Sequence, residues 1–490
     1  MKGSQSKRGI LYQPWRRPAS IRNTLVLSLL GLGAISVLGA IPPAYAATVQ
    51  VDSSWCSASG FSWNSGTCTM TSGYTISSGD TLEVPSGTTL TLSGNGFLNV
   101  LIGGSLTVDL GGTVNIKDHS GIGNGGTITN SGTITMSNSG NYGISNGGTG
   151  TITNSGTITI STGLTGVGIG SSGTFTNSGT INVANSGDSS YGFYGSGTIT
   201  NSGTIDIANS GHLTVGVFNL VNGVITNLLS GTITISNTGS GSVGVANDAT
   251  FTNSGTVNVA NSVSLGISNQ VTGTITNSGT ITITNSGDSG IDNSGSITNS
   301  GTITISNTSR TGIANGGTIT NSGTITISNT GSGSRGIDNA GTITNSGTIT
   351  ISNTGATFGI VNHAVLGTID NSGTITISNT GGTGIDNLRD GTLTNEPSGT
   401  ITISNTGGTG IDNFGTIANT GAIIIYCGGT LVNEPGYTYI GKPPQQSCTT
   451  TTTTTSSTTA GVPEFPFGLA LLLAVLVPVV VVLRKKAPSL

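Results

Sequence analysis

Four aspartates recur at one position of a repeated segment, and they are the residues best placed to do chemistry. Each follows a Gly-Ile pair; they are Asp292, Asp338, Asp386 and Asp412. Only Asp386 and Asp412 come from consecutive copies, and on stacked strands such neighbours lie roughly 4.8 Å apart. Two carboxylates at that spacing could hold Ca²⁺, which takes several oxygen ligands, or act as the carboxylate pair that glycoside hydrolysis requires. The alternative is two solvated aspartates. We predict no catalytic residue and no cofactor, and keep Ca²⁺ at Asp386 and Asp412 as the one metal candidate.

Other chemistry-bearing residues are few or far apart. The three histidines, His119, His212 and His363, fall in distant copies of the segment. The chain has no zinc spacing, P-loop or Gly-x-Ser-x-Gly motif. Only 7% of its residues are charged, and positions 47–461 hold five basic against seventeen acidic residues. Because an acidic surface repels phosphate groups, we expect no nucleic-acid partner.

Neutral side chains offer two further binding chemistries. Tyr191, Phe193 and Tyr194 fall in one copy, where they could stack on a sugar ring or pack within the structure. Thr-x-Thr pairs recur in most copies and would line up in columns. Flat Thr-x-Thr arrays resemble ice-binding faces, although outward threonine also solvates a strand that has few charges. The first Thr-x-Thr array is interrupted at Val224 and Asp370.

The elements that carry these residues follow from a repeat. Between residues 121 and 426 one unit recurs 13 times, about 24 residues apart, a period typical of repeat architectures. A unit reads Gly-Thr-Ile-Thr-Asn-Ser-Gly-Thr-Ile-Thr-Ile-Ser-Asn-Thr-Gly, then a variable piece and Gly-Ile-x-Asn. Its three alternating runs predict three short strands and exclude helices. Asn-Ser-Gly and Asn-Thr-Gly predict turns, because asparagine and glycine tolerate positive φ. Each unit therefore predicts one coil of a three-sided parallel β-helix.

The alternation assigns side chains to the inside or the outside. Ile343, Ile349 and Ile351 point inward, Ile337 supplies the third wall, and the intervening threonines point outward. Stacked coils then place like residues on like, and each buried aliphatic side chain contributes roughly 1.5–3 kcal/mol. Equivalent corner asparagines should either bond to one another as an amide ladder or be solvated turn residues. They are Asn130, Asn154, Asn177, Asn201, Asn253, Asn277, Asn299, Asn321, Asn345 and Asn371.

The wording Gly-Thr-Ile-Thr-Asn-Ser-Gly-Thr-Ile, repeated across about 350 residues, resembles pectin-lyase-like right-handed parallel β-helix proteins. It also resembles the β-helical shafts of bacterial adhesins and autotransporters. The resemblance implies an all-β right-handed solenoid. It says less about function, because this scaffold hosts lyases, hydrolases and adhesins alike.

The N-terminal residues 1–46 read as a secretory signal peptide. A basic leader precedes an apolar run and the small-residue site Ala44-Tyr45-Ala46, and a retained membrane anchor is the alternative. We expect degenerate coils and an N-terminal cap over 47–120, the repeats over 121–426 and a C-terminal cap over 427–448. An exported chain suits disulfides, and of three possible pairings we expect the local one: Cys56 with Cys68 and Cys427 with Cys448.

The C-terminus has a Thr-rich stalk over 449–461 and an anchoring segment over 462–490. The anchoring segment contains Pro463-Glu464-Phe465, an apolar stretch and a basic tail; the stretch is close to the ~20 residues that span a membrane as a helix. This order resembles archaeal PEF-type C-terminal sorting signals. The resemblance implies an archaeosortase-like enzyme that cleaves near the motif and attaches the product to lipid. An ordinary single-pass anchor is the alternative. In both cases the body faces outward at the cell surface.

These features predict a non-enzymatic, surface-anchored adhesin or cell-envelope component. Its threonine and asparagine ladders would contact cell-envelope glycans or neighbouring surface proteins through many weak interactions. Asn307-Thr308-Ser309 is an N-glycosylation sequon, so Asn307 is the predicted glycosylated residue. A carbohydrate-active lyase or hydrolase on the same scaffold is the first alternative, and an ice-binding protein is the second.

Overall fold

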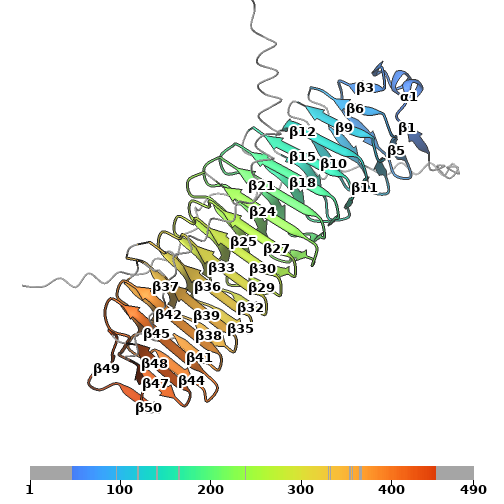
Figure 1. Ribbon diagram of the computed structural model, residues 1–490. Coiled ribbons are helices and arrows are strands. Elements are labelled where there is room, and N and C mark those ends of the chain that lie inside the picture. The colour runs from blue at the N-terminus through green and yellow to red at the C-terminus, as the bar shows by residue number, and fades with distance from the viewer. Residues whose placement is uncertain are drawn as a thin grey trace, which may run out of the picture. The chain divides into compact units, whose positions relative to one another are not determined.

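The computed structural model shows a parallel β-solenoid (Figure 1). It describes residues 47–447 except 95–96, 118–120, 140–141, 164–165, 238, 329, 332, 353–354, 356, 364–366 and 427. The expected signal peptide, Thr-rich stalk and sorting segment lie outside the described residues, as do Cys427 and Cys448. Within the described part of the chain, no helix is both long and apolar enough to cross a membrane.

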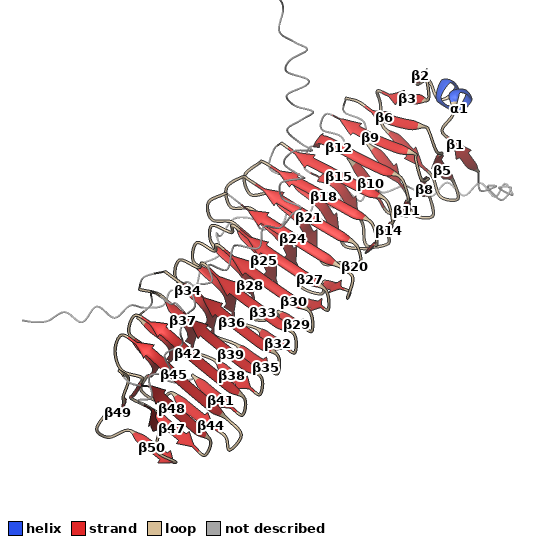
Figure 2. Ribbon diagram, in the orientation of Figure 1, coloured by secondary structure: helices blue, strands red, loops and turns tan. Residues whose placement is uncertain are grey.

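Three sheets form the walls, and each turn between the two ends adds one strand to each sheet in the order A, B, C (Figure 2). The first turn gives sheet B two strands, the antiparallel pair β2 and β3. Sheet A has β1 (Thr48–Gln50), β5 (Thr81–Val84), β8 (Ser105–Val108), β11 (Thr127–Asn130), β14 (Thr151–Asn154), β17 (Thr174–Asn177), β20 (Thr198–Asn201), β23 (Val224–Asn227), β26 (Thr250–Asn253), β29 (Thr274–Asn277), β32 (Ser296–Asn299), β35 (Thr318–Asn321), β38 (Thr342–Asn345), β41 (Thr368–Asn371), β44 (Thr392–Asn395), β47 (Thr416–Asn419) and β50 (Thr438–Gly441).

Sheet B has β2 (Ser62–Asn64), β3 (Thr67–Met70), β6 (Thr89–Leu92), β9 (Thr113–Lys117), β12 (Thr133–Ser139), β15 (Thr157–Thr162), β18 (Thr180–Asn185), β21 (Thr204–Asn209), β24 (Thr232–Asn237), β27 (Thr256–Ala260), β30 (Thr280–Thr284), β33 (Thr302–Ser306), β36 (Thr324–Ser328), β39 (Thr348–Ser352), β42 (Thr374–Thr380), β45 (Thr400–Thr406), β48 (Ala422–Tyr426) and β51 (Gln445–Ser447).

Sheet C has β4 (Tyr74–Ile76), β7 (Leu98–Val100), β10 (Ile122–Asn124), β13 (Tyr142–Asn146), β16 (Val167–Ser171), β19 (Tyr191–Gly195), β22 (Val215–Asn219), β25 (Val243–Asn247), β28 (Leu265–Asn269), β31 (Ser289–Asn293), β34 (Thr311–Asn315), β37 (Arg335–Asn339), β40 (Phe358–Asn362), β43 (Thr383–Asn387), β46 (Ile411–Asn413) and β49 (Leu431–Asn433).

Successive turns pair in parallel and in register. Ile343 on β38 pairs with Ile319 on the turn before and with Ile369 on the turn after. The described solenoid has about 15 turns of about 24 residues each, which confirms the predicted all-β, three-sided coil. We refer to the turns between strands of sheets A and B as the A–B corner, and name the B–C and C–A corners likewise.

The predicted aliphatic core is confirmed. Ile343, Ile349, Ile351 and Ile360 are each at most 2% exposed, and together they fill one turn from all three sheets. The threonines that alternate with them on β38 and β39 lie on the outer face, half-buried. Because equivalent positions stack, the core is continuous along the solenoid.

The predicted asparagine ladder exists at the A–B corner. Its amides are fully buried, and each Nδ2 donates to the Oδ1 of the next turn at 2.7–2.8 Å, from Asn130 to Asn419. A second ladder that we did not predict runs along the C–A corner, with an unbroken run of amide bonds from Asn219 to Asn433. The asparagine at the end of the repeated Gly-Ile-x-Asn run could have predicted this second ladder from the sequence.

The reason we gave for the turn glycines is wrong at the A–B corner. Gly347 does not adopt a left-handed backbone conformation. Instead, a Cβ on Gly347 would lie 2.1 Å from the carbonyl oxygen of Gly323 on the preceding turn, so glycine is needed for close stacking. Among the repeats, a positive φ is instead adopted by asparagines of the B–C corner, such as Asn285 at 57° and Asn307 at 56°.

The N-terminal end is covered by a short helix, α1 (Ser53–Ala58) (Figure 2). The Asp52 carboxylate accepts a hydrogen bond from the Trp55 amide at 2.8 Å and caps the helix. Cys56 and Cys68 form a disulfide, as predicted. The Trp55 ring meets the Tyr74 ring edge-on at 5.3 Å, so aromatic packing and a covalent link both hold α1 against the first turns.

We predict that Gly347→Ala lowers the free energy of unfolding of the full chain by about 1–3 kcal/mol, because the added methyl group overpacks the carbonyl of Gly323. Gly148→Ala is the matched control, since nothing lies within 4 Å of a Cβ at Gly148, and it should change stability by less than about 0.5 kcal/mol. Urea unfolding followed by circular dichroism measures both. Equal effects of the two substitutions would contradict the close-stacking explanation.

We also predict that Asn345→Asp costs about 3–5 kcal/mol. The Asn345 Nδ2 donates to Asn371 Oδ1 and to two carbonyl oxygens, and a carboxylate would turn these contacts repulsive in a buried site. Asn285→Asp is the control, because Asn285 makes the same kind of amide bond, to Asn261 Oδ1 at 3.0 Å, on an exposed corner. The same unfolding measurement at pH 7 should show little effect of the control. A similar loss in both variants would argue that burial of the ladder is unimportant.

Candidate functional site

The predicted aspartate column lies on the outer face of sheet C. On β43, Ile385 and Asn387 are buried and the alternation turns Asp386 outward. Asp386 and Asp412 are register partners on neighbouring strands, as the sequence predicted. Val361 separates Asp386 from Asp338 in the same column, and Ala314 separates Asp338 from Asp292. Of the four predicted aspartates, the register therefore makes neighbours only of Asp386 and Asp412.

Asp386 has an unusual electrostatic environment. Burial and the neighbouring Asp412 raise the pKa of the Asp386 carboxyl to about 6, although the positive charges of Arg335 and His363 oppose the rise. Burial, followed by Glu434, also raises the pKa of Asp412. The Oδ1 atoms of Asp386 and Asp412 are both buried and have no hydrogen-bond partner among the described residues. Asp386 therefore holds its proton up to a pH of about 6, well above the range in which an ordinary aspartate ionises.

Asp338 is held in the opposite state. Burial opposes its ionisation, but hydrogen bonds and charges from His363 and Arg335 outweigh burial and lower the pKa of Asp338. His363 and Arg335 both bond directly to the Asp338 carboxylate. We did not predict this group from the sequence, although His363 follows Asp338 by 25 residues, about one turn. The two described histidines do not meet, because His212 bonds to Ser240 on a distant turn. His119 lies outside the described residues.

The chemistry open to this face is limited by its ligand count. Within the described segments, no group of three or more His, Cys, Asp or Glu side chains is close enough to hold a metal ion. Two carboxylates are few for Ca²⁺, which takes about six to eight oxygen ligands. A protonated Asp386 beside an ionised partner can instead donate a proton, as a general acid does.

An aromatic patch occupies another part of the outer face of sheet C. It consists of Tyr142, Tyr191, Tyr194 and Phe218. The Tyr191 ring lies 5.0 Å from Tyr194 and stacks on Phe218 at 6.0 Å; the Tyr142 ring covers the neighbouring Gly170. Burial raises the pKa of both Tyr191 and Tyr194, so their phenols stay neutral hydrogen-bond donors. Phe193 does not belong to this patch, because it is buried against Phe175.

Sheet A presents two columns of outward threonines. The register aligns them from Thr127 and Thr129 onward, turn after turn. Val224 interrupts the first column and Asp370 the second, as predicted, and Ser296 further interrupts the first column. The surface is thus a nearly uncharged array of hydroxyl and methyl groups.

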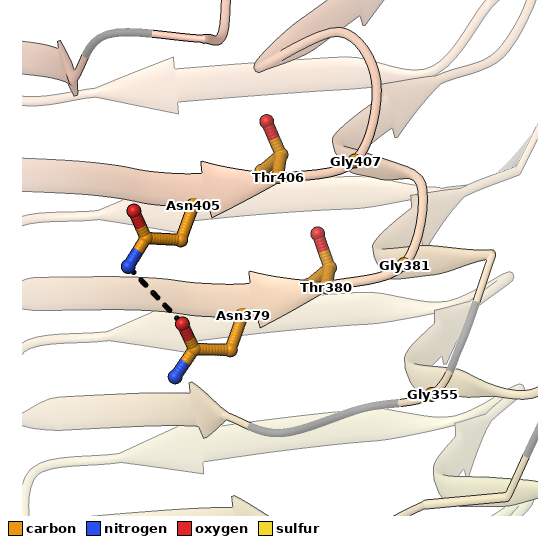
Figure 3. A pocket seen from close by; sticks show the side chains of 7 residues that line it. All are labelled: Gly355, Asn379, Thr380, Gly381, Asn405, Thr406 and Gly407. Carbon is orange, nitrogen blue, oxygen red and sulfur yellow. Dashed lines mark hydrogen bonds between the residues drawn. The ribbon is translucent and has the colours of Figure 1, made fainter.

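An exposed row of asparagines runs along the B–C corner. Asn307 Nδ2 donates to Asn285 Oδ1 at 3.1 Å, so the sequon asparagine is exposed but bonded to its neighbour. Further along, Asn405 Nδ2 donates to Asn379 Oδ1 at 3.1 Å, beside a shallow hollow (Figure 3). The hollow is lined by Gly355, Asn379, Thr380, Gly381, Asn405, Thr406 and Gly407.

Comparison with known proteins gives little further guidance. No family model and no curated protein matches the chain. Among solved structures, the chain is similar to the hyper-glycosylated fragment TibA55-350, whose glycosylation is catalysed by TibC. The two share 14% sequence identity over 82% of this chain and 97% of that chain, with a TM-score of 0.18. A similarity at this level carries no information about ligand or activity.

The raised pKa of Asp386 predicts a pH-dependent stability. The folded-state pKa of about 6 exceeds the unfolded value of roughly 3.9, so the stabilising contribution is complete below about pH 4 and is lost as the pH rises through 6. Asp386→Asn should remove this loss and stabilise the protein at pH 8 by about 1 kcal/mol, a figure reduced for solvent screening of a half-exposed group.

Unfolding in urea at pH 4 and pH 8 measures this effect. Asp206→Asn, on an exposed position of β21, is the control substitution. If Asp386→Asn leaves the difference in stability between the two pH values unchanged, the carboxylate pair does not cause it.

Proposed function

We propose that this chain is an exported, non-enzymatic cell-surface protein, acting as an adhesin or a structural component of the cell envelope. The observation that carries the proposal is the near absence of charge on outer faces that repeat in register, turn after turn. Sheet A offers threonine hydroxyl and methyl groups, and the B–C corner offers exposed amides. Such groups suit many weak contacts with neutral glycans or neighbouring surface proteins, and no cofactor is part of the proposal.

Localisation and processing complete the proposal. Residues 1–46 would direct export, and the segment around Pro463, Glu464 and Phe465 would be recognised by an archaeosortase-like enzyme or would stay as a membrane anchor. The body would face outward in either case. A right-handed, pectin-lyase-like winding is favoured because crossovers between parallel strands are right-handed in nearly all proteins. Asn307 would carry an N-linked glycan, which its exposed position at the B–C corner allows.

The aromatic patch is the place where a sugar ring would bind most strongly. Tyr191, Tyr194 and Phe218 present half-buried rings at mutual distances of 5.0–6.0 Å, and such rings are large apolar surfaces with phenol donors at the edge. The apolar face of a pyranose could lie on these rings while its hydroxyl groups bond to the phenols. The threonine columns would add weaker contacts along an extended chain.

We predict that the full chain binds a subset of neutral polysaccharides on a glycan array, and that Tyr191→Ala with Tyr194→Ala weakens binding at least tenfold. Tyr437→Ala is the matched control, because Tyr437 is a surface aromatic residue that contacts only Phe414 among the described rings. Equal binding by all variants would exclude the aromatic patch. Absence of binding to every glycan and to intact cells would overturn the adhesin function.

Polysaccharide cleavage is the second candidate, favoured by one observation: the pKa of Asp386 is raised to about 6 beside a second carboxylate. Asp386 would act as the general acid and Asp412 as its ionised partner. Incubating the full chain with acidic and neutral polysaccharides and measuring new reducing ends tests this candidate. Turnover that Asp386→Asn abolishes and Asp206→Asn retains would replace the non-enzymatic proposal.

A further inference from the structure

A column of inward-facing polar side chains lines the B–C corner. Each side chain follows the last outward residue of its sheet B strand, and each is at most 3% exposed. The members are Thr162, Asn185, Asn209, Asn237, Ser262, Ser286, Thr308, Thr330 and Thr380. The column thus puts polar groups inside the solenoid, against the aliphatic core, on nearly every turn between Thr162 and Thr380.

Six consecutive members of this column have an oxygen atom without a partner. These fully buried atoms have no hydrogen-bond partner among the described residues; they are Asn209 Oδ1, Asn237 Oδ1, Ser262 Oγ, Ser286 Oγ, Thr308 Oγ1 and Thr330 Oγ1. The Thr214 hydroxyl, on the same corner, is a seventh. Beyond this stretch the members are bonded: Thr162 donates to Asn185 Oδ1 at 2.6 Å, and Thr380 donates to the Gly382 carbonyl at 3.2 Å. The unpartnered atoms therefore form one continuous run.

The B–C column differs from the asparagine ladders in how its side chains meet the next turn. Strands of successive turns lie roughly 4.8 Å apart. An asparagine amide spans that distance, because its donor and acceptor lie on different atoms; at the A–B corner the Asn154 Nδ2 reaches Asn177 Oδ1 at 2.7 Å. The hydroxyls of the unpartnered run in the B–C column have no such partner, whereas exposed serines of neighbouring turns can bond directly, as Ser278 Oγ does to Ser254 Oγ at 3.1 Å.

We propose that a single file of bound water molecules fills this corner, with one water between the polar groups of successive turns from Asn209 to Thr330. A gap of roughly 4.8 Å between two oxygens is the span that one bridging water closes. Between Asn209 and Asn237 a water would donate to both Oδ1 atoms. Between two hydroxyls, each water would accept from the hydroxyl of one turn and donate to the oxygen of the next, which satisfies groups whose burial would otherwise be costly. This water file is independent of the proposed function.

One end of the column lies beside the surface hollow. Thr380 and its neighbour on the next turn, Thr406, both line the hollow at the B–C corner (Figure 3). Thr406 donates to the carbonyl oxygen of Gly408 at 3.1 Å, so the members at this end are satisfied by their own turn.

Isosteric removal of one hydroxyl tests the water file. Thr308→Val keeps the shape of the side chain and deletes only the bonding group. If water bridges this position, the variant leaves that water and its neighbouring polar groups without a hydrogen-bond partner. The equilibrium constant for unfolding should then rise at least fivefold. If the hydroxyl has no partner, the variant should be more stable than the unmodified chain. Thr304→Val, an outward position on β33, is the matched control and should have little effect.

Two measurements on the unmodified full chain keep the test independent of variant folding. A crystal structure at high resolution should show ordered water within hydrogen-bond distance of Ser286 Oγ and Thr308 Oγ1. Magnetic relaxation dispersion of water should count several long-lived internal molecules, and Thr308→Val should reduce that number. Density showing these hydroxyls bonded to carbonyls of their own turns, or stabilisation by Thr308→Val, would overturn the proposal.

Discussion

Stacking in register, with every turn directly over the one before, is the constraint on which the structure depends. The hydrogen bonds of three parallel sheets fix the separation of turns, and equivalent residues such as Ile319, Ile343 and Ile369 therefore contact one another. Each position must accommodate copies of itself above and below. In the core, branched aliphatic residues pack well on copies of themselves. At the corners, glycine leaves room for the carbonyl oxygen of a neighbouring turn. The repetition of the sequence is a direct consequence of this geometry.

The same constraint decides which polar groups of the interior form hydrogen bonds between turns. An amide carries a donor and an acceptor far enough apart to bridge two turns, so the A–B corner and most of the C–A corner close into ladders without help from solvent. The hydroxyls of the B–C column between Ser262 and Thr330 form no such bonds among the described residues. The B–C corner therefore differs from the other two, although all three corners are built from the same small set of residues.

Outward side chains do not have to pack against copies of themselves, so the turns differ from one another on the outer faces. Sheet A stays almost uniform, whereas sheet C carries an aromatic patch on some turns and carboxylates on others. Charge appears on sheet C in two forms. Asp338 is compensated by Arg335 and His363, while Asp386 is destabilised as an anion by burial and by Asp412. Chemical variety on the outside is therefore a property of the non-repeated residues, and the scaffold supplies their spacing.

The sequence by itself determined the period, the three strands of each turn, the inward isoleucines, the A–B ladder and the pairing of Asp386 with Asp412. It could do so because these features recur with the repeat, and any residue that recurs in register must stack. Only the tertiary structure decided that His363 binds Asp338, that Phe218 joins Tyr191 and Tyr194, and that Gly347 serves close approach. The first two contacts involve single residues on neighbouring turns whose loops differ in length, so which side chains meet depends on the path of each loop and on side-chain direction, neither of which the repeat encodes. The glycine at position 347 does recur with the repeat, but whether it serves positive φ or close approach depends on the backbone path, which the residue type leaves open.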